Sequence, residues 1–328
     1  MPWPQDVRGL VRGLHLALRA GLARLSGAPG AVPTTDRSFL IDIPDFGPNP
    51  GGLTMRVFIP PRPRALAASR APLVVVLHGC GQQAAFFAEC SGWCAWAERL
   101  GLVLILPEQQ PANHRGRCFR WFDATQTARN QGEAGSIRAM IGTAQSRFGT
   151  DPHAVFVVGL SAGGAMAAAL LAAYPDIFAA GAVVAGLPVG AANGATQALL
   201  RMAHADTKTS QTVDLARGAA PSGFAGPWPR LSIWAGAMDR TVDPVNATML
   251  ACQWRGLHGN AARLEQQELL RSGVLHQSWG SVVELWTLPA LAHAYPIGPE
   301  AGQAAPFVVP TGLSATLQIL AFWRLLRT

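Results

Sequence analysis

A serine in a glycine-rich turn is the clearest sign of chemistry in this sequence. The stretch Val155–Gly164 reads Val-Phe-Val-Val-Gly-Leu-Ser-Ala-Gly-Gly and carries a GxSxG pattern centred on Ser161. A β-branched run precedes the pattern and an alanine-rich run of helix formers follows it. This order of strand, sharp turn and helix projects a serine hydroxyl above the edge of a sheet. We therefore predict that Ser161 is a nucleophile; the alternative is an incidental serine in a glycine-rich turn.

A serine hydroxyl becomes a good nucleophile when a base removes its proton and an acid orients that base. In folds with this turn, the acid and the histidine follow the serine along the chain. Asp239 lies just beyond the apolar run 231–234, and His293 follows the last apolar run. We predict Asp239 as the acid and His293 as the base. Asp243 is the competing acid, but it precedes Pro244 and a helical pattern, so we expect it to cap that helix.

The tetrahedral intermediate of acyl transfer carries a negative oxygen, which two backbone N–H groups normally receive. The residue after the nucleophile, Ala162, supplies one of them, and the loop after the third strand supplies the other. That loop reads Leu77-His-Gly-Cys-Gly-Gln82, and its glycines allow the N–H of Cys80 to turn inward. We predict Cys80 and Ala162 as the oxyanion donors, with the Cys80 thiol packed and not activated by His78.

Apolar runs alternate with helical patterns from about residue 50 onward. The predicted strands are short apolar runs, most of them bounded by glycine or proline, at 53–59, 73–77, 102–106, 155–158, 182–185, 231–234 and 283–288. The predicted helices are 84–100, 133–148, 162–174, 245–257 and 313–325. Such alternation predicts an α/β fold with a mostly parallel, doubly wound sheet and helices on both faces.

A Pro/Gly-rich cluster at 44–52 marks a boundary in the chain. We expect a leader segment over 1–45 and a single catalytic domain over 46–328. The stretch 186–229 is rich in glycine, proline and alanine and has no clear strand. We interpret it as an insert in the domain, with a lid over the site as one of its uses.

Composition excludes several classes of protein. Of the 328 residues, 49% are hydrophobic and 14% charged, which rules out a disordered chain. The formal net charge is +7, but the basic residues are spread along the chain without a dense run, which argues against a nucleic-acid partner. No apolar stretch reaches the roughly 18 residues that span a bilayer. No pattern has metal-ligand spacing, and we expect no metal and no cofactor.

The five cysteines form an odd set. We expect reduced, buried thiols, because a secretory signal requires an uninterrupted apolar core and arginines break up the start of this chain. If the chain is exported, a disulfide between Cys118 and either Cys90 or Cys94 is the alternative.

Residues 1–30 have the pattern of a basic amphipathic helix. The apolar residues recur at helical spacing, at Val7, Val11, Leu14, Leu18, Leu22 and Leu25. Arginines and a histidine gather on the flank of that face. The pattern predicts a helix that lies on an apolar particle or lipid surface, or one that packs on the domain.

Several short stretches between about residues 50 and 300 carry a resemblance to a known family. They are His78-Gly-Cys-Gly-Gln82, Trp93, Pro107-Glu-Gln109, Arg117-Cys-Phe-Arg-Trp-Phe122, Gly132-Glu133, Gly159-Leu-Ser-Ala-Gly-Gly-Ala-Met166 and Ala292-His-Ala294. Together they resemble the poly(3-hydroxybutyrate) depolymerase family of esterases, which also contains feruloyl and acetylxylan esterase relatives. The resemblance implies the α/β-hydrolase fold and a Ser–Asp–His hydrolase of ester bonds. It places Ser161, Asp239 and His293 at the matching positions, with the backbone of Cys80 as an oxyanion donor.

Two stretches depart from the family. Where members often read Cys-Trp-Asn-Trp-Phe, this chain has Cys118-Phe-Arg-Trp-Phe122, and where they often read Gly-His-Ala-Trp, it has Ala292-His-Ala-Tyr295. Both are expected to border the substrate cleft, so we predict that Trp121 and Tyr295 contact the aliphatic chain of the substrate.

Our leading hypothesis is a serine esterase that hydrolyses short-chain polyhydroxyalkanoate, such as poly(3-hydroxybutyrate), or its oligomers. The alternatives are a feruloyl- or acetylxylan-type carbohydrate esterase and a non-catalytic protein that binds a granule surface. Family members without an export signal act on intracellular polyester granules. We therefore expect a cytoplasmic protein that associates with granules through residues 1–30, with a secreted or periplasmic protein as the alternative.

Overall fold

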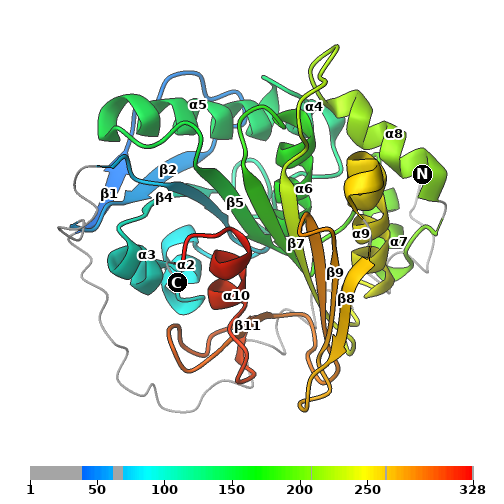
Figure 1. The fold of residues 1–328 in the computed structure, drawn as a ribbon. Coiled ribbons are helices and arrows are strands. Elements are labelled where there is room, and N and C mark those ends of the chain that lie inside the picture. The colour runs from blue at the N-terminus through cyan, green and yellow to red at the C-terminus, as the bar shows by residue number, and fades with distance from the viewer. Residues whose placement is uncertain (1–38, 62–68, 208, 263, 327–328) are drawn as a thin grey trace.

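Ten strands of the computed structural model form one sheet, which contains all seven predicted strands (Figure 1). The structure describes residues 39–61, 69–207, 209–262 and 264–326. Six neighbouring strands run parallel: β4 (Val103–Glu108), β3 (Leu73–Leu77), β5 (Val155–Leu160), β6 (Ala180–Val184), β7 (Arg230–Gly236) and β10 (Val283–Leu288). These strands are apolar and almost completely buried, as parallel strands covered on both faces must be.

Antiparallel strands complete both edges of the sheet. β1 (Leu40–Ile43) and β2 (Thr54–Phe58) lie beside β4, whereas β9 (Leu275–Trp279) and β8 (Leu264–Leu269) lie beside β10. The sequences of β8 and β9, Leu-Glu-Gln-Gln-Glu-Leu and Leu-His-Gln-Ser-Trp, are largely polar, as suits strands at an edge that solvent reaches. The apolar pattern therefore predicts β2 but not β1, β8 or β9.

Helices cover the two faces of the sheet and create two cores. On one face lie α5 (Gly132–Phe148), α6 (Ala162–Ala173) and α9 (Val245–His258); on the other lie α2 (Ala84–Cys90), α3 (Trp93–Leu100) and α10 (Ala315–Phe322) (Figure 1). Alternate residues of β3 separate accordingly: Val75 and Leu77 pack in the first core, Val74 and Val76 in the second. The predicted α/β fold with helices on both faces is confirmed. Within the described residues, no helix combines the length and apolar composition of a membrane span.

The single helix predicted over 84–100 is wrong, because the chain breaks there into α2 and α3. Gly92 separates the two helices with φ 84°, a left-handed conformation that glycine adopts readily. A side chain at Gly92 would lie 3.1 Å from the backbone of Ala301, so the segment after β11 (Tyr295–Ile297) packs directly against the break. Trp93 is the first residue of α3, and its side chain is fully buried.

The stretch 186–229, interpreted from the sequence as an insert, contains two helices that the sequence did not predict, α7 (Ala195–Ala203) and α8 (Thr209–Ala219). Val213 of α8 packs against the core beside α9, where Gly256 leaves room for it: a side chain there would lie 2.6 Å from Val213. Both helices are short, and the many glycines and prolines around them are typical of an irregular stretch, although each helix has apolar residues at helical spacing. α7 carries Met202 to the carboxyl edge of the sheet, where the candidate site lies.

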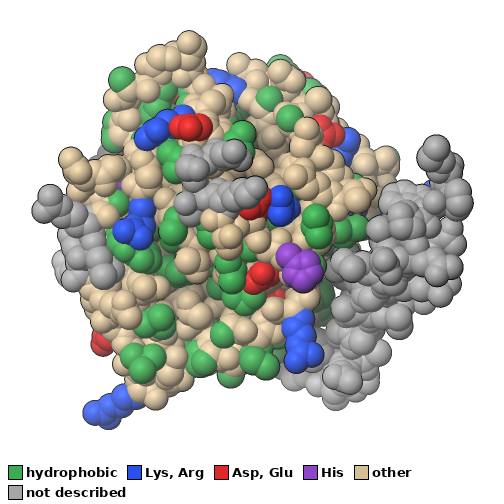
Figure 2. Space-filling model, turned by 90° about the vertical axis from the view of Figure 1, so that its right-hand side faces the viewer, with side chains coloured by type: hydrophobic (Ala, Val, Ile, Leu, Met, Phe, Trp, Pro, Cys, Tyr) green, Lys and Arg blue, Asp and Glu red, His purple; other side chains and the backbone are tan. Residues whose placement is uncertain are grey.

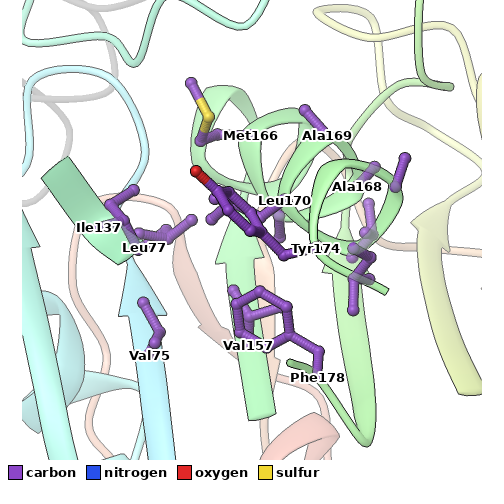
Figure 3. Packing of buried hydrophobic residues seen from close by; sticks show 14 of the residues in the cluster. Val75, Leu77, Ile137, Val157, Met166, Ala168, Ala169, Leu170, Tyr174 and Phe178 are labelled. Atoms are coloured by element: carbon purple, nitrogen blue, oxygen red, sulfur yellow. The ribbon is translucent and has the colours of Figure 1, made fainter. Parts of the chain in front are cut away.

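Close packing of α6 on the sheet fixes the start of this helix. All residues of α6 are buried, and Figure 3 shows Leu170 and Tyr174, at its C-terminal end, over Val157 of β5. At its N-terminal end, a side chain at Gly163 would lie 2.5 Å from the carbonyl oxygens of Leu77 and His78. The helix can approach β3 this closely only because residue 163 has no side chain.

We therefore expect Gly163→Ala to lower the free energy of unfolding by about 2–3 kcal/mol, because the new methyl group must displace backbone atoms. Gly142→Ala in α5 is the matched control. A side chain there would meet only the flexible end of Arg138 at 3.3 Å, and we expect stability to be unchanged or raised by up to about 1 kcal/mol. Urea unfolding followed by circular dichroism measures both. Equal effects of the two substitutions would contradict this account of the packing.

Candidate active site

Ser161 lies at the turn between β5 and α6 in an unusual backbone conformation, with φ 58° and ψ −120°. Its N–H donates to the carbonyl oxygen of Val184, and its carbonyl oxygen accepts from the N–H of Ala165, both at 2.9 Å. A side chain at Gly159 would collide with the backbone of Gly163, so the strand and the helix are in direct contact around the serine. The surrounding structure thus holds a strained residue in place, as is usual for functional serines in such turns.

The loops after β7 and β10 bring the predicted acid and base to this serine. His293 Nε2 lies 2.9 Å from Ser161 Oγ, and His293 Nδ1 lies 2.6 Å from Asp239 Oδ2. A side chain at Gly236, the last residue of β7, would collide with the carbonyl oxygens of Leu291 and Ala292, so the two loops lie against each other. Three residues far apart in the sequence therefore form one continuous hydrogen-bonded chain.

The surroundings of Asp239 fix the tautomer of the histidine. Asp239 Oδ1 accepts from the N–H groups of Thr241 and Val242 at 2.8 and 2.9 Å, which leaves Oδ2 to accept from His293. His293 Nδ1 therefore carries the proton and Nε2 presents a lone pair to the serine hydroxyl. Asp243 lies one residue before Pro244, the N-cap of α9; its Oδ1 accepts from the N–H of Val245 in the first turn, and its Oδ2 accepts from the N–H of Ala205 at 3.1 Å.

The two predicted oxyanion donors are backbone N–H groups without a hydrogen bond to any other described residue. The N–H of Ala162 belongs to the first turn of α6, and Cys80 lies in the loop after β3. Hydrogen bonds on both sides hold that loop: Gly81 N–H donates to Gly116 O, and Gly79 N–H donates to Gln82 Oε1, both at 2.8 Å. Two available donors beside a nucleophile match what a developing oxyanion requires.

The prediction of reduced thiols is wrong for Cys80 and Cys118, which form a disulfide. β3 and β4 are neighbours in the sheet, so the loops that follow them meet at its carboxyl edge. The alternative pairing of Cys118 with Cys90 or Cys94 is also wrong. Both of these thiols are free and buried in the core around α2 and α3, and burial raises the pKa of each.

A buried polar network beneath the site was not predicted. His78 is fully buried; its Nδ1 donates to Gly79 O at 2.7 Å and its Nε2 accepts from the N–H of Gln109 at 3.1 Å. Burial lowers the pKa of His78, which keeps it neutral. The side-chain amide of Gln109 in turn donates to Glu133 Oε1 at 2.5 Å. The network joins the loops after β3 and β4 to α5, so His78 has a structural role. It does not activate the thiol of Cys80, which is bonded to Cys118.

Glu133 anchors the loop that carries Cys118. Its Oε2 accepts from the N–H of Arg120 at 2.8 Å, and burial raises the pKa of Glu133 to about 7. The only sequence signal for this network was the family resemblance, which includes His78, Gln109 and Glu133 among its matching residues.

A cavity of about 260 Å³ opens beside Ser161 and His293. Its lining comes from the loops after β3, β4, β7 and β10, from the loop before β12, from the turn between β5 and α6, and from α7: Gly79, Cys80, Gln82, His114, Arg115, Gly116, Cys118, Leu160, Ser161, Met202, Thr241, His293 and Phe307. Leu160, Met202 and Phe307 contribute apolar side chains to this lining, and Arg115 is the only arginine, lysine or acidic residue in it. Among the described residues, no cluster of His, Cys, Asp and Glu could hold a metal ion.

The predicted substrate contact of Tyr295 is wrong. Tyr295 begins β11 (Tyr295–Ile297), which pairs with β12 (Val308–Pro310), and its side chain is completely buried. The Tyr295 hydroxyl lies 3.1 Å from Trp93 Nε1 and 2.8 Å from Thr316 Oγ1, inside the core. The residue two positions after His293 has turned away from the cavity, a reversal that the sequence pattern could not reveal.

Trp121 lies beside the cavity and not in its lining. It packs against Ala165 and Leu187, together with Met202, and it lines a second hollow of about 240 Å³ between α6 and the insert. The cluster thus forms a partition between the two hollows. Any contact between Trp121 and a substrate remains a prediction.

Comparisons with known proteins show the family and support the fold. The profile of the family described as Esterase PHB depolymerase matches residues 53–266. Poly(3-hydroxyalkanoate) depolymerase C of Paucimonas lemoignei is 34% identical over 89% of this chain and 72% of its own length. A probable acetylxylan esterase A of Aspergillus fumigatus is 29% identical over 88% of this chain and 78% of its own. The structure of the acetyl xylan esterase from Aspergillus awamori superposes with a TM-score of 0.74 at 23% identity and covers 88% of this chain and 99% of its own, which supports the fold.

The geometry makes Asp239 and Asp243 a matched pair of acids with different expected roles. Asp239→Asn removes the carboxylate that fixes the tautomer of His293, so we expect kcat on p-nitrophenyl butyrate to fall by about 10⁴-fold, as does the loss of the acid in serine proteases. Asp243 lies outside the chain of hydrogen bonds from Asp239 to Ser161; its two oxygens accept from the N–H groups of Val245 and Ala205. Asn caps helices about as well as Asp, so Asp243→Asn should keep most of the activity and lower stability by at most about 1 kcal/mol. Similar losses of activity in the two variants would contradict the assignment.

Proposed function

The chain belongs to the esterase PHB depolymerase family of carboxylic ester hydrolases, and from this premise we propose that it cleaves short-chain hydroxyalkanoate polyester or its oligomers with Ser161 as nucleophile. The hydrogen-bonded chain from Asp239 through His293 to Ser161 is the observation that carries the proposal. It ends inside a cavity that a small ester can enter.

In the proposed mechanism, Ser161 Oγ attacks the ester carbonyl while His293 Nε2 takes the hydroxyl proton. The N–H groups of Cys80 and Ala162 receive the negative charge on the carbonyl oxygen. His293 then protonates the departing alcohol, and Asp239 stabilises the imidazolium throughout. A water molecule attacks the acyl-enzyme by the same steps, which releases the acid and restores the serine.

The size and lining of the cavity support a short, flexible acyl chain. Its volume of about 260 Å³ lies just below the roughly 300–1,000 Å³ that is usual for ligand pockets. Leu160, Met202 and Phe307 contribute aliphatic and aromatic side chains to the lining. The relative from Paucimonas lemoignei is a poly(3-hydroxyalkanoate) depolymerase, and the units of such a polymer are small and aliphatic, which suits this lining.

A substrate panel tests the proposal. We expect the purified enzyme to release acid from amorphous poly(3-hydroxybutyrate) and from its soluble trimer, with a kcat/KM for the trimer at least tenfold above that for methyl ferulate and for acetylated xylan. The Ser161→Ala variant is the control for contaminating esterases and should be inactive on all four. Preference for methyl ferulate or acetylated xylan would replace this proposal with a carbohydrate esterase.

We further propose that residues 1–30, which lie outside the described residues, adsorb the enzyme to the surface of a polymer particle. The amphipathic pattern with its basic flank supports this role. The Cys80–Cys118 disulfide favours the secreted or periplasmic alternative over the expected cytoplasmic location, because disulfides persist mainly in oxidising compartments. The particle would then lie outside the cytoplasm.

Deletion of residues 1–30 should abolish co-sedimentation with amorphous polyester particles while activity on p-nitrophenyl butyrate is retained. A full-length variant with Leu14, Leu18 and Leu22 replaced by Gln keeps the charge and length of the segment and should lose adsorption in the same way, since the apolar face drives insertion. If both variants adsorb as strongly as the parent chain, the segment is not the anchor.

A further inference from the structure

The cavity beside Ser161 contains one cationic side chain that the proposed mechanism does not use. Arg115 lines the cavity, is exposed, and has no ion pair with any described acidic residue. Some arginines elsewhere are paired: Arg56, Arg120 and Arg129 each lie within 3.0 Å of a carboxylate oxygen. Others, such as Arg147, resemble Arg115 and have no ion pair with a described acidic residue. On the face of the molecule in Figure 2, basic side chains are likewise scattered and several lie beside acidic ones. Arg115 is distinguished by its position, because it is the only arginine among the residues that line the cavity beside Ser161.

The loop around Arg115 is held in place before any ligand binds. The ring of His114 accepts through Nδ1 from the N–H groups of Gly116 and Cys118, at 3.2 and 3.3 Å. The N–H of Arg117 donates to the carbonyl oxygen of His114 at 2.8 Å. Cys118 also forms a disulfide with Cys80, so this loop is covalently linked to the loop after β3 that carries the predicted oxyanion donor. A rigid loop lets a charged side chain contribute to binding without a large ordering cost.

The second polar group of this part of the lining is also a donor. Burial and the nearby charge of Arg120 lower the pKa of His114, and its Nδ1 already accepts two hydrogen bonds. The neutral ring therefore carries its proton on Nε2. His114 and Arg115 both line the cavity, and they present N–H donors and one positive charge without a carboxylate among the lining residues. Such a lining selects a ligand that has acceptor oxygens and a negative charge.

We infer that His114 and Arg115 form a subsite for the terminal carboxylate of a hydroxyacid oligomer, and this inference rests on the proposed function. In such an oligomer, the unit that carries the free carboxylate also contributes its hydroxyl group to the adjacent ester. The carboxylate therefore lies on the alcohol side of the bond that Ser161 cleaves. A cavity of this size keeps the anchored carboxylate within a few atoms of the serine, so the enzyme releases short hydroxyacids from the carboxyl end.

The test compares the free acid of the 3-hydroxybutyrate trimer with its methyl ester, in which a neutral ester replaces the terminal carboxylate; cleavage is followed at the internal ester bonds, by the hydroxyacid units released and not by methanol. We expect the parent enzyme to prefer the free acid by about tenfold in kcat/KM, mainly through a lower KM. One charge-assisted hydrogen bond to a partly exposed group increases affinity by about this factor. Arg115→Gln should bring the ratio close to one, and Arg115→Lys should retain part of the preference. The preference should also weaken as the salt concentration rises.

Arg147→Gln is the matched control. Arg147 is exposed in the last turn of α5, near the start of β5 and thus at the opposite edge of the sheet from Ser161, so this variant loses the same charge without touching the cavity. It should keep the tenfold ratio. An equal ratio in the parent enzyme and in Arg115→Gln would overturn the inference and leave the polyester substrate intact. Hydrolysis of p-nitrophenyl butyrate without hydrolysis of either trimer would overturn both.

Discussion

The direct contact of β5 with α6 is the constraint on which the rest of the site depends. Ser161 has a positive φ, and a residue with a side chain holds that conformation only when its surroundings leave no other choice. Gly159 and Gly163 provide those surroundings, since neither position has room for a methyl group. The alanines of α6 extend the same close approach along the helix and make it part of the core. The stability of the fold and the exposure of one hydroxyl group thus come from the same packing.

The parallel sheet then gathers the remaining groups. The carboxyl ends of β3, β5, β7 and β10 meet at one edge, so loops far apart in the chain bring Cys80, Ser161, Asp239 and His293 together. Further contacts within the loops fix the geometry: two backbone donors hold Asp239, and a disulfide and a buried carboxylate hold the loops after β3 and β4. The site is rigid before a substrate arrives, which is what electrostatic stabilisation of a transition state requires.

The sequence predicted what depends on continuous local pattern. The bounds of β3 and β10 are those predicted, because a short, largely apolar run in an α/β protein usually forms a buried strand of the sheet. Chain order and sheet polarity together led to Asp239 and His293. Features that depend on long-range neighbours escaped: the partner of Cys118 follows from the order of the strands, and Tyr295 turned into the core through a reversal next to His293. The edge strands β8 and β9 are mostly polar and lack the continuous apolar run that marks the central strands.

The central claim is that Ser161 is the group that attacks the substrate and that His293 activates it. A fluorophosphonate ester tests it most directly, because a serine alkoxide displaces fluoride and retains the phosphonyl group. Intact-mass analysis should show one adduct per chain, and peptide mapping should place it on Ser161; labelling should be absent in Ser161→Ala and slowed by orders of magnitude in His293→Ala. An adduct on another residue, or labelling at the parent rate without His293, would contradict the account.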